Sequence, residues 1–83
     1  MSKVEKIFEK LMSGQSDANF SFDELRILLV KLGYLARSTK GSHFIFQSKN
    51  GSFLNLQETQ GGKAKSYQVR QVREELKKRD IRP

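Results

Sequence analysis

The sequence predicts a single α+β domain: a three-stranded antiparallel sheet with helices on one face, plus an extra helix at the N-terminus. Two segments with apolar residues at helical spacing flank a central stretch of alternating apolar and polar residues, which glycine-containing turns divide. A chain of 83 residues is long enough for one core. At this size, folding buries only about 60–65% of the surface that the unfolded chain exposes. We therefore expect an α-β-β-β-α unit preceded by one helix.

The first predicted helix covers residues 1–12. Ser2 and Glu5 have the spacing of a capping box, and Gly14 is typical of a helix end. One apolar face recurs at helical spacing, at Val4, Ile7, Phe8 and Leu11. A polar linker follows at 13–19. We expect residues 1–20 to be an appended helix and linker, and residues 21–83 to be the functional domain.

The second helix has the clearest signals in the chain. Ser21 and Glu24 predict a second capping box, and Phe20 with Leu25 has the spacing of a hydrophobic staple. Gly33 predicts the end of the helix. The apolar stripe between these ends consists of Phe22, Leu25, Leu28, Leu29 and Leu32.

Three strands are expected at 34–39, 42–47 and 52–56. Asn50-Gly51 predicts a two-residue type I′ hairpin turn between the last two. Strand alternation separates Phe44 and Phe46 from the residues of the opposite face, which are His43, Ile45 and Gln47. We expect the two phenylalanines in the core, because exposing them would forfeit about 1.5–3 kcal/mol of burial each. His43 then lies on the face that the helices leave open.

The last helix is expected to start with Ser66 as its cap, after a loop at 57–65 with two glycines and two lysines. Its apolar residues recur at helical spacing, at Val69, Val72 and Leu76. The predicted core consists of Phe44, Phe46, Leu54 and Leu56 on the strands and Leu25, Leu28, Leu32, Val69, Val72 and Leu76 on the helices.

Composition excludes several kinds of site. The chain has no cysteine and one histidine, so disulfides, thiol nucleophiles and cysteine–zinc centres are excluded, and the sequence predicts neither a metal site nor a cofactor. The longest aliphatic run, residues 27–30, is too short to span a bilayer, and the charged N-terminus does not resemble a signal peptide. We expect a cytoplasmic protein with no membrane partner.

The charge distribution points to a polyanionic partner. The formal net charge is +7, and residues 1–20 carry three basic and three acidic side chains, so residues 21–83 hold the whole excess. A basic field of this kind attracts nucleic acid. The alternative is that the charge serves solubility alone.

His43 is the only side chain here whose unperturbed pKa lies near neutrality. A small exposed site suits RNA, because the RNA 2′-OH can attack the adjacent phosphodiester. The protein then needs only to move protons and to stabilise the developing charge. Arg37 and Lys40 are candidates for charge stabilisation. The alternative is a histidine with only a structural role in its strand.

The segment 32–46, LGYLARSTKGSHFIF, resembles the signature of the HicA family of toxins: a glycine and an aromatic residue, then a basic residue, then Gly41-Ser42-His43 opening a strand. The segment 63–72, KAKSYQVRQV, is similar to the basic segment that leads into the last helix of that family. The resemblance covers about residues 22–80. Residues 1–20 are an addition to the family pattern, Tyr34 stands where tryptophan is more usual, and the loop 57–65 has no histidine.

The resemblance implies a fold like the double-stranded RNA-binding domain. It also implies an mRNA interferase, the endoribonuclease toxin of a type II toxin–antitoxin pair, with a HicB-like antitoxin as its partner. His43 matches the catalytic residue of the family, and Gly41 and Ser42 match the supporting positions of its motif. The general acid, the RNA target and the oligomeric state stay open.

Two other functions remain alternatives. A non-catalytic module of the same fold would bind double-stranded RNA through phosphate and 2′-OH contacts. For either RNA-binding function, we expect phosphate contacts from Lys63, Lys65 and Arg70, near the start of the last helix. A protein–protein adaptor would instead present the amphipathic N-terminal helix to a groove on a partner.

Overall fold

The computed structural model describes residues 2–83 and confirms the predicted α+β class. The three strands form one antiparallel sheet in the order β1-β2-β3. Within the described residues, no helix is long and apolar enough to cross a membrane. The elements are α1 (Lys3–Ser13), the 3-10 helix η1 (Asp17–Asn19), α2 (Phe22–Lys31), β1 (Leu35–Lys40), β2 (His43–Gln47), β3 (Phe53–Gln57) and α3 (Ser66–Lys78).

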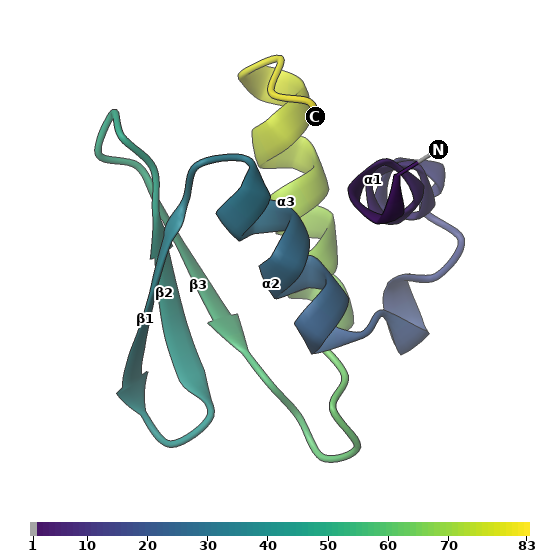
Figure 1. The fold of residues 1–83 in the computed structure, drawn as a ribbon. Coiled ribbons are helices and arrows are strands. Elements are labelled where there is room, and N and C mark those ends of the chain that lie inside the picture. Colours follow the sequence, from purple (N-terminus) through teal and green to yellow (C-terminus); the bar gives the residue numbers. More distant parts are fainter. Residues whose placement is uncertain (1) are drawn as a thin grey trace.

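The elements form three layers (Figure 1). Helices α2 and α3 lie against one face of the sheet, and α1 contacts both of them on the side away from the sheet. The main core lies between the sheet and α2 and α3. The opposite face of the sheet, here called the open face, is not covered by any helix in Figure 1.

The side-chain alternation expected for β2 is observed. Phe46 is fully buried, and Phe44 is half-buried with its ring centroid 5.0 Å from that of Phe22. His43 is exposed. The other predicted core residues are buried, except Leu32, which is partly buried against the core. The two inward-facing leucines of β3, Leu54 and Leu56, complete the apolar face under the helices.

Strand β1 is an exposed edge. All six of its residues are exposed, in contrast to β2 and β3, which α2 and α3 cover on the inner face. An uncovered edge strand invites pairing with another chain, and charged side chains and bulges discourage it. Strand β1 has both, since it carries Arg37 and Lys40 and its register shifts between Ser38 and Lys40.

The helix caps follow the sequence at α1 and only in part at α2. Ser2 and Glu5 form the full capping box, and Gly14 ends α1 with a left-handed φ of 72°. Ser21 accepts from the backbone N–H of Glu24 at 3.2 Å. The Glu24 carboxylate forms an ion pair with Lys10 of α1. The second hydrogen bond of the predicted capping box, from the Ser21 backbone to the Glu24 side chain, is therefore replaced by an ion pair that joins α1 to α2.

The predicted type I′ turn at Asn50-Gly51 is wrong. The loop has three residues, 49–51, because Ser48 N–H donates to the Ser52 carbonyl at 2.9 Å and Gly51 N–H donates to the Ser48 carbonyl at 3.1 Å. A type I′ turn requires a positive φ at both Asn50 and Gly51. Gly51 has a φ of 90°, but Asn50 does not have a positive φ, since Asp80 is the only non-glycine residue with one among residues 2–83. A three-residue hairpin needs the left-handed conformation only at its last position, so glycine alone takes it.

The predicted cap of the last helix is also wrong by one residue. Lys65 is the N-cap, without a side-chain hydrogen bond, and Ser66 is already helical. The preceding loop explains the earlier start. Ala64 N–H donates to the Phe20 carbonyl at 2.9 Å, and Ala64 is buried. Because this backbone contact fixes the chain at Ala64, the helix begins directly after it.

Helix α1 belongs to the same hydrophobic core as the rest of the chain. Ile7 and Leu11 are buried in that cluster. The guanidinium of Arg73 on α3 holds this end of the chain, with hydrogen bonds of 2.9 Å to each carboxylate oxygen of Asp17 and of 3.1 Å to the Leu11 carbonyl. Bidentate pairs of this kind are among the stronger hydrogen-bonded contacts.

This contact predicts an acid-sensitive part of the stability. Hydrogen bonding to Arg73 lowers the pKa of Asp17 below its ordinary value. The stabilisation is therefore present above the unfolded-state pKa, which is about 3.9, and is lost as the pH falls through the lower folded-state pKa. Asp17→Asn should lower the free energy of unfolding by about 1–2 kcal/mol at neutral pH. The difference from wild type should shrink as the pH falls below the unfolded-state pKa.

Urea unfolding at several pH values measures this difference. The matched control is Asp23→Asn, because Asp23 pairs with Arg26 at an exposed position and should change stability by less than about 0.5 kcal/mol. An Asp17→Asn effect that stays constant from pH 7 to pH 2 would show that the ionised carboxylate is not its source.

Candidate functional site

His43 is the first residue of β2 and follows a tight turn at Gly41-Ser42. Gly41 has a φ of 58°, a left-handed conformation that side-chain-bearing residues rarely adopt. The register pairs Lys40 with His43 across the turn, and the Thr39 hydroxyl donates to the His43 carbonyl at 3.2 Å. The bulge at Thr39 brings Lys40, rather than Thr39, opposite His43. Gly41 therefore shapes the turn that places the lysine and the histidine side by side.

The register arranges the open face in three rows that cross the strands. The first row, Lys40–His43–Gln57, lies at the turn end of the sheet. The middle row is Arg37–Ile45–Asn55, and the third is Leu35–Gln47–Phe53. The structure thus brings together three of the predicted site residues, since directly paired residues share a face.

This part of the chain has one sign of charge. Residues 35–57 contain three basic residues, Arg37, Lys40 and Lys49, and no aspartate or glutamate. Arg37, Lys40 and His43 are all exposed. The sheet therefore offers the imidazole cationic neighbours and no carboxylate of its own. A phosphodiester is the kind of group that such a surface attracts.

The other predicted RNA-binding residues form a second basic group, in the loop after β3 and on α3. Lys63 is exposed, and its ammonium group lies 3.4 Å from the Asn19 carbonyl. Lys65 precedes α3, with its ammonium 5.9 Å from the Tyr67 ring centroid. Arg70 is exposed on the second turn of the helix. No acidic residue occupies the first turn of α3, so its N-terminal backbone N–H groups favour an anion.

Backbone contacts join the two basic groups. Glu58 N–H donates to the Ser42 carbonyl at 3.0 Å, which holds the start of the loop beside the turn that precedes His43. Gln57 is the cross-strand partner of His43, and its N–H donates to the Gln68 side-chain carbonyl of α3 at 2.8 Å. Figure 1 accordingly shows the β1–β2 turn, the loop and the start of α3 at the same end of the molecule.

Sequence reasoning missed the role of Gln68. It is the one buried polar residue in the core region of residues 2–83, with 8% of its surface exposed. Its side chain ties α3 to the end of β3, as described above. The spacing offered a signal, because Gln68, Val72 and Leu76 recur every four residues and so share one helix face.

A second missed feature is a polar cluster at the far end of α3. The Glu75 carboxylate accepts from the Tyr34 hydroxyl at 3.3 Å and from the Ser52 hydroxyl at 2.9 Å, and pairs with Arg79 at 2.8 Å. Burial, followed by the nearby Glu75 charge, raises the pKa of Tyr34 to about 12. These contacts tie α3 to the β2–β3 loop and to the segment after α2, so the cluster is structural.

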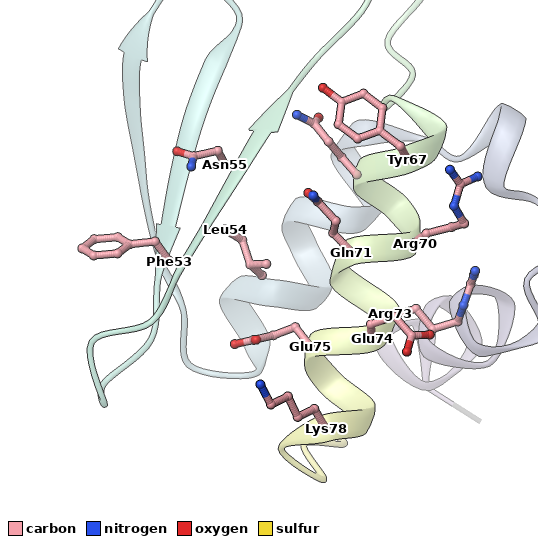
Figure 2. Close-up of a pocket in the computed structure, with 11 residues that line it drawn as sticks. Phe53, Leu54, Asn55, Tyr67, Arg70, Gln71, Arg73, Glu74, Glu75 and Lys78 are labelled. Carbon is pink, nitrogen blue, oxygen red and sulfur yellow. The ribbon is translucent and has the colours of Figure 1, made fainter.

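A groove of about 930 Å³ lies between β3 and α3 (Figure 2). Arg70 and Gln71 line it from the helix, and Phe53, Leu54 and Asn55 line it from the strand. His43 is not among its lining residues. The imidazole is therefore on the open face of the sheet and outside this concavity.

The described residues, 2–83, contain no group of three or more His, Cys, Asp or Glu side chains placed to hold a metal ion. Comparisons with family models, with curated proteins and with solved structures gave no match to this chain.

Proposed function

We propose that this protein is a metal-independent endoribonuclease in which His43 moves the protons of the reaction. The observation that carries the proposal is the environment of His43. It is exposed on an uncovered sheet face, lies opposite Lys40 in the strand register, and belongs to a segment, residues 35–57, that contains no acidic residue. An exposed site of this kind suits a long polyanion, which supplies its own nucleophile and is held largely by charge.

In the proposed reaction, the RNA 2′-OH attacks the adjacent phosphorus and the bond to the 5′ oxygen breaks. The His43 imidazole acts as general acid or base in the accompanying proton transfers. Lys40 or Arg37 stabilises the charge that develops on the phosphoryl oxygens. The leaving 5′ oxygen takes up a proton, so the products are a 2′,3′-cyclic phosphate and a 5′-hydroxyl end.

The same proposal extends to the biological role. The Gly41-Ser42-His43 motif and the basic segment 63–72 resemble the HicA family, and the element order α2-β1-β2-β3-α3 agrees with the double-stranded RNA-binding-domain-like fold that this resemblance implies. We therefore propose a cytoplasmic toxin that cleaves mRNA and is neutralised by a HicB-like antitoxin. Residues 21–83 would form the HicA-like domain, and α1 would be an N-terminal helix added to that domain.

Two observations bear on the alternative functions. The adaptor role requires a free amphipathic helix, whereas Ile7 and Leu11 of α1 are buried in the core. The binding-only role is supported by the second basic group, Lys63, Lys65 and Arg70, which lies at a helix N-terminus and does not need His43. Cleavage separates the binding-only role from the proposed one.

The experiment that tests the proposal is digestion of a labelled single-stranded RNA in the presence of EDTA. We expect fragments that end in a 2′,3′-cyclic phosphate or 3′-phosphate, and growth inhibition when the protein is expressed without a partner. Tight RNA binding without any fragments would favour the binding-only module. Cleavage that stops in EDTA would contradict the metal-independent mechanism.

A further inference from the structure

The open face carries an exposed aromatic ring whose position does not serve the core. Phe53 is 55% exposed, whereas the other five phenylalanines are buried or half-buried. Figure 2 shows Phe53 pointing away from α3, while the adjacent Leu54 points toward that helix. A single exposed apolar side chain is common on protein surfaces, so the inference depends on the groups that share the face of Phe53.

Phe53 shares its face with His43. The register pairs His43 with Gln57 and Gln47 with Phe53, so the two rows are four residues apart along β2 and β3. An even separation keeps both side chains on one face, and four residues of strand correspond to about 13 Å. Between them lies the row of Arg37, Ile45 and Asn55. A ligand that reaches from the imidazole on β2 to the ring on β3 therefore passes over Ile45 and Asn55, and Arg37 lies beside this path on β1.

Single-stranded RNA is the ligand that this sequence of groups fits. Aromatic rings on exposed sheets stack on unpaired bases, and cations beside them bind the phosphates. A duplex hides its base faces within the stack, so it offers nothing for Phe53 to stack on. A protein partner would also accept the ring, but the absence of acidic residues over 35–57 matches a polyanion better than a mixed protein surface.

We propose that single-stranded RNA crosses the open face, with one base stacked on Phe53 while the scissile phosphate lies at His43. This inference rests on the proposed function and adds the strandedness of the substrate and a positioning residue. Leu35, which is 74% exposed, lies in the same row on β1, with Gln47 between it and the ring. Phe53 fixes the path of the RNA and takes no part in the chemistry.

Fluorescence anisotropy with a labelled single-stranded RNA tests the proposal in a His43→Ala background, where cleavage does not interfere with binding. Phe53→Leu keeps an apolar side chain without a ring and should weaken binding about ten- to a hundredfold, the usual cost of losing one stacked base. Phe53→Tyr keeps a ring and should restore affinity to within about threefold of the parent. The control Val30→Ala removes an exposed apolar side chain on α2 and should leave affinity unchanged.

Two further measurements separate stacking from a general loss of affinity. Binding to a duplex of the same sequence should not respond to Phe53→Leu. With the histidine restored, Phe53→Leu should raise the KM for single-stranded RNA more than it lowers kcat. Equal affinities of the Phe53→Leu and parent proteins for single-stranded RNA would overturn the inference. A protein partner would then be the better explanation for the exposed ring.

The outcomes also distinguish this inference from the proposed function. If wild type cleaves RNA and Phe53→Leu has the same KM, the nuclease function is supported and the stacking role of Phe53 is overturned. If Phe53→Leu weakens binding to single-stranded RNA but wild type cleaves no RNA, the stacking role of Phe53 is supported and the nuclease function is overturned. If wild type does not bind RNA at all, both are overturned.

Discussion

Replacing His43 with alanine is expected to lower the rate of RNA cleavage by about 10²–10⁴, the usual contribution of a positioned acid–base group. The fold should survive, because His43 is exposed and the core lies on the other face of β2. We expect the free energy of unfolding to change by less than about 0.5 kcal/mol, as for most surface substitutions. Growth inhibition should disappear together with cleavage.

Single-turnover cleavage assays measure this effect, with circular dichroism and denaturant unfolding as checks on the fold. Gln15→Ala is a suitable control, because Gln15 is an exposed neutral residue in the linker after α1 and should cleave at the wild-type rate. A folded His43→Ala protein that cuts RNA as fast as wild type would remove the only imidazole from the mechanism. The binding-only function would then replace the proposed one.

Replacing Phe46 with alanine should have the largest effect on stability, about 3–5 kcal/mol. Phe46 is fully buried, and its ring centroid lies 6.5 Å from that of Phe22 in an edge-to-face arrangement. Phe44→Ala should cost less, because Phe44 is only half-buried. Phe53→Ala is the control on the same sheet, and it should cost less than about 1 kcal/mol since more than half of that side chain is exposed.

Urea unfolding monitored by circular dichroism gives these differences. A domain of this size has few kcal/mol to lose, so Phe46→Leu provides a milder second variant, expected to lie between wild type and Phe46→Ala. The order Phe46, then Phe44, then Phe53 is the essential result. Equal losses at Phe46 and Phe53 would show that the register of β2 and β3 is not the one described.

Local signals in the sequence were sufficient for most elements. The Ser2–Glu5 box and Gly14 set the ends of α1, and they act within a few residues of chain. Alternation alone placed Phe46 inside and His43 outside. The exposed position of the candidate catalytic residue was thus predictable, because only one register buries the phenylalanines.

Two of the errors and omissions come from long-range contacts. Ser66 is not the cap of α3, since the chain is already fixed at Ala64 by its contact with Phe20. The Arg73–Asp17 pair joins residues 56 positions apart, and no local pattern predicts such a pair. The bulge that brings Lys40 opposite His43 was not predicted either. The placement of Lys40 opposite His43 could therefore be recognised only from the three-dimensional fold.

In the proposed reaction, the RNA supplies its own 2′-OH as nucleophile and His43 assists the proton transfers. The most direct measurement uses a short RNA whose cleavage position has been mapped, alongside the same RNA with a single 2′-deoxy nucleotide on the 5′ side of that bond. We expect wild type to cut the first RNA and to leave that bond of the second intact, while both RNAs bind with similar affinity. Cleavage of the deoxy bond at an undiminished rate would contradict it.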